Sequence, residues 1–351
     1  MWIRVNFKKV LGITVVVSLM ISGYRVGALY TSLVQPFRGY VSGEMVVEIP
    51  QGMSGSAIGS RLIETGVVSD YSLFRWALRV TGKGPWLQSG HYRFDRPMSA
   101  TEVVRKIARG DVMLSAITFP EGLRLDEMAA VFERSGLGTA SEFMAAAIDA
   151  SLIANLDTEA VDLEGYLFPD TYRVPVGTTA RELVVEMVRG FERAFSAELK
   201  RAAEKQGYTV RQVVTLASLV EKETARANER RTVAGVYRNR LNIGMGLQCD
   251  PTVIYALQIA GLYDGNLTRA NLNFDSPYNT YRYPGLPPGP IAAPGKASLE
   301  AALSPEKVDY LFFVSRNDGS HAFARTLREH NRNVQTYQVR YFREKRRKKA
   351  Q

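Results

Sequence analysis

The chain has 351 residues, of which 46% are hydrophobic and 23% are charged, and its formal net charge is +10. This length corresponds to about two domains, and the apolar content excludes collagen-like, low-complexity and charge-rich disordered chains. A single cysteine, Cys249, excludes an intramolecular disulfide and a cysteine-cluster metal site. Three histidines without an H-E-x-x-H pair do not favour a zinc site, so we expect no metal.

Most of the net charge lies at the two ends of the chain. The last eleven residues, 341–351, carry six Lys or Arg and one Glu, and four more basic residues flank an apolar stretch near the N-terminus. A basic tail without interleaved aromatic residues is a generic electrostatic feature. We therefore expect a solvated tail over residues 341–351 and no nucleic-acid partner.

The N-terminus predicts a membrane anchor. An apolar run from Val10 to Tyr24 resumes after Arg25 as far as residue 34, which gives the roughly 20 residues needed to cross a bilayer. The preceding positive charges predict a cytoplasmic stub over residues 1–9, an anchor over 10–34 and export of the remainder. A cleaved signal peptide is the alternative, because Val26-Gly27-Ala28 resembles a cleavage site. The renewed apolar character after Arg25 favours the retained anchor.

Two copies of one sequence pattern follow at an offset of 70 residues. Residues 47–78 align without gaps with residues 117–148, and each copy reads as a strand, a turn, a helix stopped by glycine and a second helix. Residues 90–94 alternate like a returning strand. This order resembles a LysM module, so we predict a LysM-like glycan-binding unit over residues 44–112 and a second related unit over 113–155. A plain spacer or packing role is the alternative.

From about residue 156 the chain changes to polar, aromatic and proline-rich motifs, which usually line a site when they form loops. Asp318-Gly319 between two alternating runs predicts a hairpin, and we expect His321, directly after its turn, at the surface. A capping box at residues 326–329 predicts a last helix that runs into the basic tail. The whole pattern predicts an α+β fold, with one N-terminal transmembrane helix, LysM-like α/β subdomains and a mixed α+β domain over residues 156–340.

One carboxylate in this region is placed for acid catalysis. A capping box at residues 209–212 opens a helix on which Glu221 lies within the apolar stripe, whereas Glu223 lies about 160° away. Desolvation raises the pKa of a carboxyl group, and a protonated carboxyl is what general-acid cleavage of a glycosidic bond needs. The alternative is a structural ion pair with an arginine such as Arg226 or Arg230.

Other polar residues in these motifs are also candidates for a cleft, and each has a structural alternative. Turn capping would account for Glu164 and Asp170 in EGYLFPDTY, and loop hydrogen bonding and packing would account for Tyr278 and Asn279. For Asp250, which precedes a proline, helix capping is the favoured interpretation.

Taken together, these motifs resemble the endolytic murein transglycosylases of the MltG, or YceG-like, family. The resemblance covers nearly the whole chain and includes EGYLFPDTY, ASLVEKET, NRLNIGMGLQCDPTVIYAL, YNTYRYPGLPPGPIAAPG and SHAFARTLREHN. The family's catalytic glutamate, the first Glu of the EKE motif, matches Glu221. Cys249 stands where a small hydroxyl residue is more usual, and Ala293 stands where Asn or Thr is frequent. Neither departure touches Glu221.

The resemblance implies a catalytic domain over residues 156–340 that cleaves the bond between N-acetylmuramic acid and N-acetylglucosamine in nascent peptidoglycan strands. The muramyl 6-hydroxyl attacks in place of water and leaves a 1,6-anhydro end, with Glu221 acting first as acid and then as base. No metal or organic cofactor is implied. The expected partners are peptidoglycan strands, the cell (inner) membrane and peptidoglycan synthases, with the catalytic domain on the periplasmic side. The expected substrate contacts are Glu164, Asp170, Gln248, Tyr278 and Asn279.

Two other functions remain open from the sequence. A muramidase would use Glu221 with Glu164 or Asp170 as the second carboxylate that hydrolysis requires. A non-catalytic wall-binding scaffold would use the LysM-like region, with a structural Glu221.

Overall fold

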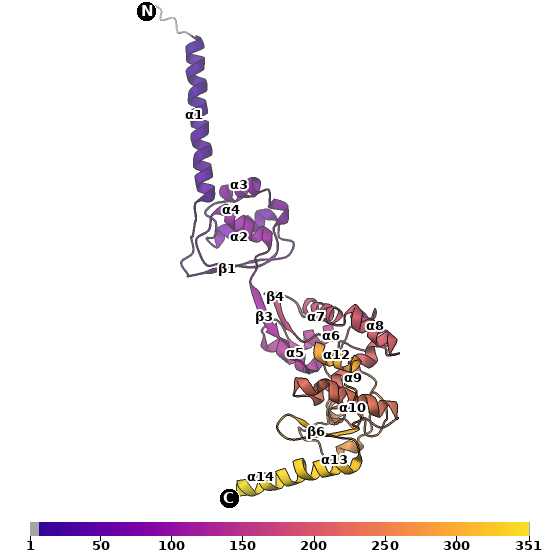
Figure 1. Cartoon of the computed structure of the whole chain (residues 1–351). Helices are drawn as coiled ribbons and strands as arrows, with labels where there is room; N and C mark the ends of the chain where they lie inside the picture. The colour runs from indigo at the N-terminus through magenta and orange to yellow at the C-terminus, as the bar shows by residue number, and fades with distance from the viewer. Residues whose placement is uncertain (1–6, 351) are drawn as a thin grey trace, which may run out of the picture. The chain divides into compact units, whose positions relative to one another are not determined.

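The computed structural model describes residues 7–350 and divides into two compact units, shown along the chain in Figure 1. Unit 1 contains the described residues up to Ser115 and the short segment Arg173–Gly177, and unit 2 contains Ala116–Tyr172 and the chain from Thr178 onward. The fold is mixed α+β, as expected. Its described strands form two-stranded sheets that pair β1 with β2, β3 with β4 and β5 with β6.

Unit 1 begins with the long helix α1 (Phe7–Val34), and the expected apolar helix is thereby confirmed. The helical segment from Leu11 to Val34 is long enough and apolar enough to cross a membrane. Most of their side chains are exposed, whereas Leu29 and Leu33 at the C-terminal end pack on the core of unit 1. A helix with apolar side chains on all sides suits a lipid environment. Residues 1–6 of the expected stub lie outside the described residues.

The rest of unit 1 has the expected order of strand, two helices and returning strand. β1 (Met45–Ile49) pairs antiparallel with β2 (Gly90–Phe94), with Val47 opposite Tyr92. Between them lie α2 (Gly55–Glu64), α3 (Tyr71–Thr81) and the 3-10 turn η1 (Gly84–Trp86), and α4 (Ala100–Arg109) follows β2. The inward strand residues, such as Val47 and Tyr92, are buried with Phe74 and Leu62 of the helices. Alternation in the strands and amphipathic helices therefore produce one core.

The chain passes between the units through β3 (Leu114–Thr118) and β4 (Thr171–Pro175), which pair with each other. Within unit 2, β3 leads into α5 (Leu125–Arg134) and α6 (Ala140–Ala147), followed by the 3-10 turn η2 (Ala150–Ile153). The strand, helix and helix predicted for the second copy of the repeat are present. Their core rings include Phe119, Phe132 and Phe143, with centroids of Phe132 and Phe143 5.4 Å apart.

The remaining helices of unit 2 pack around α9 (Val210–Glu223), in which every residue from Val213 to Val220 is buried. Its neighbours include α8 (Ala197–Lys205), α10 (Arg230–Asn242), α11 (Asp250–Ile259) and α12 (Lys296–Leu303). The other elements are α7 (Ala180–Ala194), the 3-10 turns η3 (Ala227–Glu229) and η4 (Asn271–Asn273), β5 (Phe312–Ser315), β6 (His321–Ala324), α13 (Leu327–Val334), the π-helical turn η5 (Gln335–Arg340) and α14 (Tyr341–Ala350). The predicted hairpin at β5–β6 and the predicted last helix are confirmed.

Candidate active site

Helix α9 carries Glu221 to the edge of the unit 2 core. The predicted capping box is present, because the Thr209 hydroxyl accepts from the backbone N–H of Gln212 and the Gln212 side chain accepts from the N–H of Thr209. The helix is buried on all sides from Val213 to Val220, and the side chain of Glu221 is only 6% exposed. The predicted burial of this carboxylate is confirmed.

Each oxygen of the Glu221 carboxylate accepts one hydrogen bond. Arg230 Nη2 donates to Oε1 at 3.1 Å, and the backbone N–H of Gly295 donates to Oε2 at 3.0 Å. The ion pair of the structural alternative is therefore present, with Arg230 as the partner, whereas Arg226 donates to the Asp318 carbonyl. The donors come from α10 and from the loop before α12, so three separate segments meet at this carboxylate.

A second carboxylate, Glu121, shares the same arginine. Its Oε2 lies 3.3 Å from Arg230 Nη2, and burial, followed by the negative charge of Glu221, raises the pKa of Glu121. A Cβ on Gly295 would lie 1.8 Å from Glu121 Oε1, so any other residue at position 295 would displace this carboxylate. The sequence analysis missed Glu121. The repeat is the sequence feature that could have identified Glu121, because this residue aligns with the polar Gln51 of the first copy.

The Glu121 turn and the loop before α12 hold each other through backbone bonds. Gly122 N–H donates to the Ala293 carbonyl and Ala293 N–H donates to the Leu123 carbonyl, both at 2.8 Å. The Lys222 ammonium also donates to the Gly122 carbonyl at 3.1 Å. Ala293 is buried and takes part through its backbone, which explains why the position can dispense with a polar side chain.

The predicted contact Glu164 is 7% exposed and interacts with the beginning of α5. Its Oε2 accepts from Leu125 N–H at 3.3 Å, while Oε1 has no hydrogen-bond partner among the described residues. Burial raises the pKa of Glu164 to about 8, although the bond from Leu125 opposes the shift. Glu164 therefore carries a proton at neutral pH. It caps the N-terminus of α5, whereas the turn-capping alternative placed its bond within the EGYLFPDTY motif.

Two of the predicted contacts, Asp170 and Gln248, have exposed side chains. Asp170 accepts from the N–H of Thr171 at 2.7 Å, as the turn-capping alternative predicts. Gln248 has a left-handed backbone (φ 47°), and its N–H donates to the Thr280 carbonyl. A non-glycine residue in this region is strained, and such strain is found at functional positions.

The loop that carries Tyr278 and Asn279 is held by internal contacts. Tyr278 is half-buried against Tyr255, with ring centroids 4.9 Å apart. Asn279 is fully buried; its amide donates to the carbonyls of Leu272 and Phe274 and accepts from the N–H of Tyr281. These bonds use both amide hydrogens and hold the loop, as the loop-bonding alternative predicts.

Glu223, at the end of α9, and Asp250, at the beginning of α11, belong to a polar cluster that is separate from Glu221. Glu223 is half-buried and accepts from the Cys249 thiol at 3.2 Å, and desolvation of its carboxylate raises its pKa. The capping role expected for Asp250 is wrong, because its carboxylate accepts from the Tyr281 hydroxyl at 2.5 Å and α11 has no side-chain cap. Cys249 thus takes part in a bond to Glu223.

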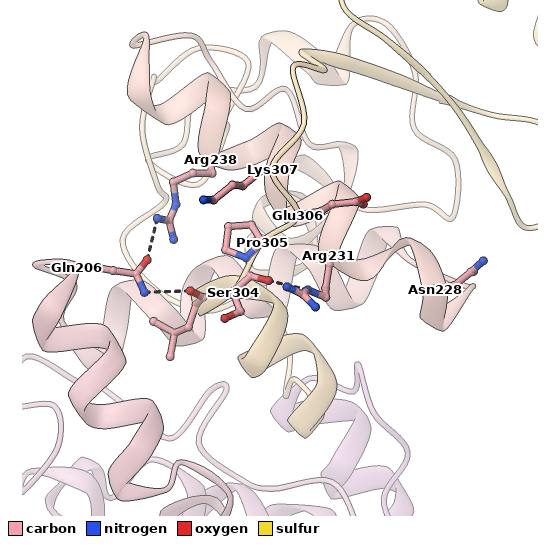
Figure 2. A pocket seen from close by; sticks show the side chains of 9 residues that line it. Gln206, Asn228, Arg231, Arg238, Ser304, Pro305, Glu306 and Lys307 are labelled. Atoms are coloured by element: carbon pink, nitrogen blue, oxygen red, sulfur yellow. Dashed lines mark hydrogen bonds between the residues drawn. The ribbon is translucent and has the colours of Figure 1, made fainter.

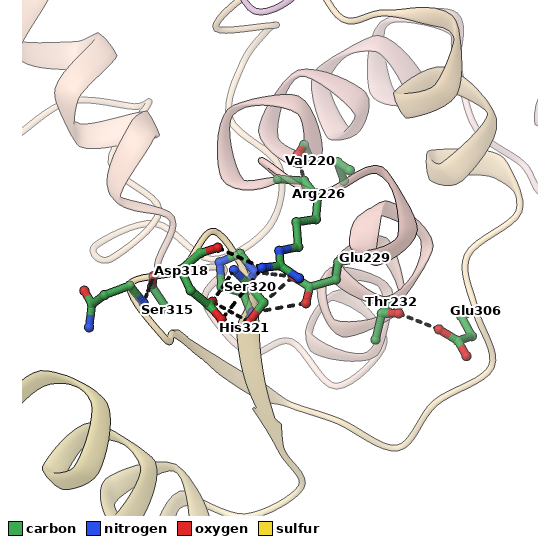
Figure 3. A network of polar contacts seen from close by, with 11 residues as sticks. Val220, Arg226, Glu229, Thr232, Glu306, Ser315, Asp318, Ser320 and His321 are labelled. Carbon is green, nitrogen blue, oxygen red and sulfur yellow. Dashed lines mark hydrogen bonds and ion pairs between the residues drawn. The ribbon is translucent and has the colours of Figure 1, made fainter.

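His321 is also placed differently from the prediction, because it is buried. Its Nδ1 lies 2.7 Å from Glu229 Oε2, and its backbone N–H donates to both oxygens of the same carboxylate. Figure 3 shows this contact beside Arg226 and the Asp318 turn. The pair fastens the β5–β6 hairpin to η3, directly before α10 and Arg230.

These contacts define a class of site: a carboxylate at the end of a buried helix, held between a guanidinium and a backbone N–H and accompanied by a second carboxylate. Such a group is suited to acid–base chemistry. Within residues 7–350 no cluster of three or more His, Cys, Asp or Glu side chains is arranged to hold a metal ion.

The YceG-like family model matches residues 47–336, and the chain belongs to that family. It is 33% identical to an endolytic murein transglycosylase of Bacillus subtilis over 87% of this chain and 88% of the relative. It is 32% identical to an endolytic murein transglycosylase of Streptococcus pneumoniae over 83% of this chain and 58% of the relative. A crystal structure of a yceG-like protein from Listeria monocytogenes is similar, with a TM-score of 0.57 and 34% identity over 83% of this chain and 98% of that one.

Proposed function

We propose that this chain is an endolytic peptidoglycan lytic transglycosylase. It cleaves the bond between N-acetylmuramic acid and N-acetylglucosamine within nascent glycan strands, leaves 1,6-anhydromuramyl ends and so terminates strand elongation. The observation that carries the proposal is the buried Glu221 carboxylate, held at the end of α9 by Arg230 and Gly295. It stands at the position of the family's catalytic glutamate.

In the proposed reaction Glu221 protonates the leaving glycosidic oxygen and then accepts the proton of the muramyl 6-hydroxyl. One carboxylate can serve both steps because the nucleophile already belongs to the substrate. Arg230 assists, since it keeps Glu121 as a partner while Glu221 carries the proton. Glu223 takes no part, because its carboxylate lies in the cluster with Cys249. Among the predicted contacts, Asp170, Gln248, Tyr278 and the capping residue Glu164 remain proposed cleft residues.

The second candidate function is a muramidase, and one observation favours a particular form of it. Hydrolysis with retention needs two carboxyl groups roughly 5 to 5.5 Å apart. Glu121 and Glu221 both lie within 3.3 Å of the same nitrogen of Arg230, whereas Glu164 caps the distant helix α5 and Asp170 caps its own turn. Glu121 is therefore the better second carboxylate for this alternative.

The test is to treat intact peptidoglycan sacculi with the detergent-solubilised full chain and with Glu221→Gln, then analyse the released ends by mass spectrometry. Anhydromuramyl ends from the wild type alone are expected. Reducing muramyl ends that have gained water would establish the muramidase instead. Equal products from both proteins would exclude Glu221 as the catalytic group, and no product from either would favour the wall-binding scaffold.

We also propose that α1 is a retained single-pass anchor in the cell (inner) membrane, with a short cytoplasmic N-terminus and both units in the periplasm. Its uninterrupted helix from Phe7 to Val34 and the positive charges before it support this topology. Peptidoglycan synthases would then be neighbours in the same membrane. Protease treatment of intact spheroplasts should digest both units, and mass spectrometry of the mature protein should find the residues before Ala28 retained. A start after Ala28 would mean a cleaved signal peptide.

For unit 1 we propose a LysM-like contact with glycan over residues 44–112, and for residues 113–155 a second copy that supplies Glu121. A cavity of about 380 Å³ lies between the turn after β1 and the segment before β2, lined by Pro50–Met53 and Leu87–Ser89. Gln51 and Gln88 supply amides there, which suit sugar hydroxyls and acetamides. Gln51→Ala should weaken binding of the Glu221→Gln protein to sacculi. Unchanged binding would favour the spacer role.

A further inference from the structure

A cavity of about 750 Å³ in unit 2 has an excess of positive charge (Figure 2). Arg231 and Arg238 of α10 and Lys307 of the loop after α12 line it. None of these cations is ion-paired with a carboxylate of the described residues. The one lining carboxylate, Glu306, accepts from the Thr232 hydroxyl at 2.5 Å. The cavity lining therefore carries a net positive charge, with three cations against one carboxylate.

Arg238 is held in place as a fixed cation. Its Nη1 donates to Gln206 Oε1 and its Nη2 donates to the Ala302 carbonyl, both at 2.9 Å. Its guanidinium also lies 4.6 Å from the centre of the Tyr208 ring. Because these partners are neutral, they orient the guanidinium without cancelling its charge.

Arg231 and Lys307 have donors that remain free for a ligand. Arg231 donates from Nε to the Ser304 carbonyl at 2.8 Å, and its terminal nitrogens make no hydrogen bond to the described residues. Lys307 is exposed and makes neither a hydrogen bond nor an ion pair with any of the described residues. A guanidinium with two free terminal nitrogens and an ammonium that line the same cavity are suited to bind a carboxylate.

This cavity adjoins the candidate active site. A second cavity of about 450 Å³ shares Arg231, Leu303 and Ser304 with it and is also lined by Arg230. Arg230 is the residue whose Nη2 lies 3.1 Å from the Glu221 carboxylate. The shared lining residues thus connect the basic cavity with the environment of the proposed catalytic group.

We propose that the basic cavity binds free carboxylates of the stem peptides that a peptidoglycan strand carries. This inference rests on the proposed function and names the part of the substrate that lies outside the glycan cleft. The stem peptide is attached to the lactyl group of N-acetylmuramic acid, beside the bond that is cleaved. A groove that runs from Arg230, the partner of Glu221, to unpaired cations therefore fits a peptide-bearing strand better than a bare one.

The test compares three glycan preparations of equal length with the full chain: peptide-bearing strands, strands stripped of peptide by an amidase, and peptide-bearing strands with amidated carboxyl groups. We expect wild-type kcat/KM to be highest for the first, and we expect the preference over the other two to fall about tenfold in Lys307→Glu, which reverses one charge at the cavity. Lys345→Glu on the exposed helix α14 makes the same change in net charge and should keep the preference.

Binding in the Glu221→Gln background separates this inference from the proposed function. Suppose that this protein binds peptide-bearing strands more tightly than amidated ones and that Lys307→Glu removes the difference. The carboxylate-binding cavity is then supported even if the wild-type protein cleaves no strand. Cleavage with equal kcat/KM for all three substrates would overturn the site while the function stands. A dependence on Lys307 that appears only with strands bearing a reducing-end pyrophosphate would also overturn it.

Discussion

Arg230 Nη2 lies 3.1 Å from Oε1 of Glu221, and the same nitrogen lies 3.3 Å from a carboxylate oxygen of Glu121. One cation therefore bridges two acids that are 100 residues apart in the sequence. When one acid takes up a proton, the guanidinium keeps a negative partner in the other. This arrangement lets Glu221 change its charge during a reaction without leaving Arg230 unpaired in a half-buried position.

Glu121→Gln should lower kcat more than it changes KM. With a neutral amide at position 121, Arg230 loses one of its two carboxylate partners, and the site loses a titrating group whose pKa is raised by burial and by the charge of Glu221. We expect the pH–rate profile to change where Glu121 titrates, above the ordinary carboxyl range. Glu204→Gln on the exposed surface of α8 is the control. An unaltered pH profile with unaltered kcat would remove Glu121 from the mechanism.

Arg230→Met should destabilise unit 2 at neutral pH by about 2 kcal/mol, because it leaves a buried carboxylate without its cation. The loss should shrink when Glu221→Gln is present as well, because the neutral amide no longer needs the cation. Urea unfolding of the single and double variants measures both quantities. Arg226→Met, which removes an exposed guanidinium, should cost less than about 0.5 kcal/mol. An equal loss with Glu221 and with Gln at position 221 would contradict the electrostatic explanation.

Glu164→Gln should remove a pH dependence of stability. Burial raises the pKa of Glu164 to about 8, so the folded protein binds this proton more tightly than the unfolded chain does. The free energy of unfolding therefore falls as the pH rises from the ordinary carboxyl range through about 8. The glutamine variant should match the wild type near pH 5 and exceed it by at least about 2 kcal/mol at pH 9. Parallel stability curves would disprove the buried, protonated state.

Asn279→Ala should cost about 3 kcal/mol of stability, because it leaves the carbonyls of Leu272 and Phe274 and one N–H without partners. Thermal unfolding measures the loss. At a temperature where the variant is folded, its KM should change no more than that of other loop variants. A large rise in KM with unchanged stability would return Asn279 to the substrate contacts.

Local patterns in the sequence were sufficient for the helices and their ends. Capping boxes at Thr209, Thr326 and Thr179 are present, and the repeat gave the strand–helix–helix order of both copies. These features depend on neighbours three or four residues apart, so a linear pattern contains all the information that they need. The position of Glu221 on the inner face of α9 follows from the same periodicity.

Only the tertiary structure decided which polar groups meet. Glu121 reaches Arg230 because two backbone bonds join its turn to the loop before α12, and no periodicity within either segment encodes that contact. The same holds for His321, whose bonds to Glu229 bury it, in contrast to the surface position expected from the hairpin turn. A side chain's burial and partners depend on segments distant in the chain. The sequence therefore determined the elements and the proposed catalytic acid, whereas packing determined the second carboxylate, the shared arginine and the unpaired cations beside them.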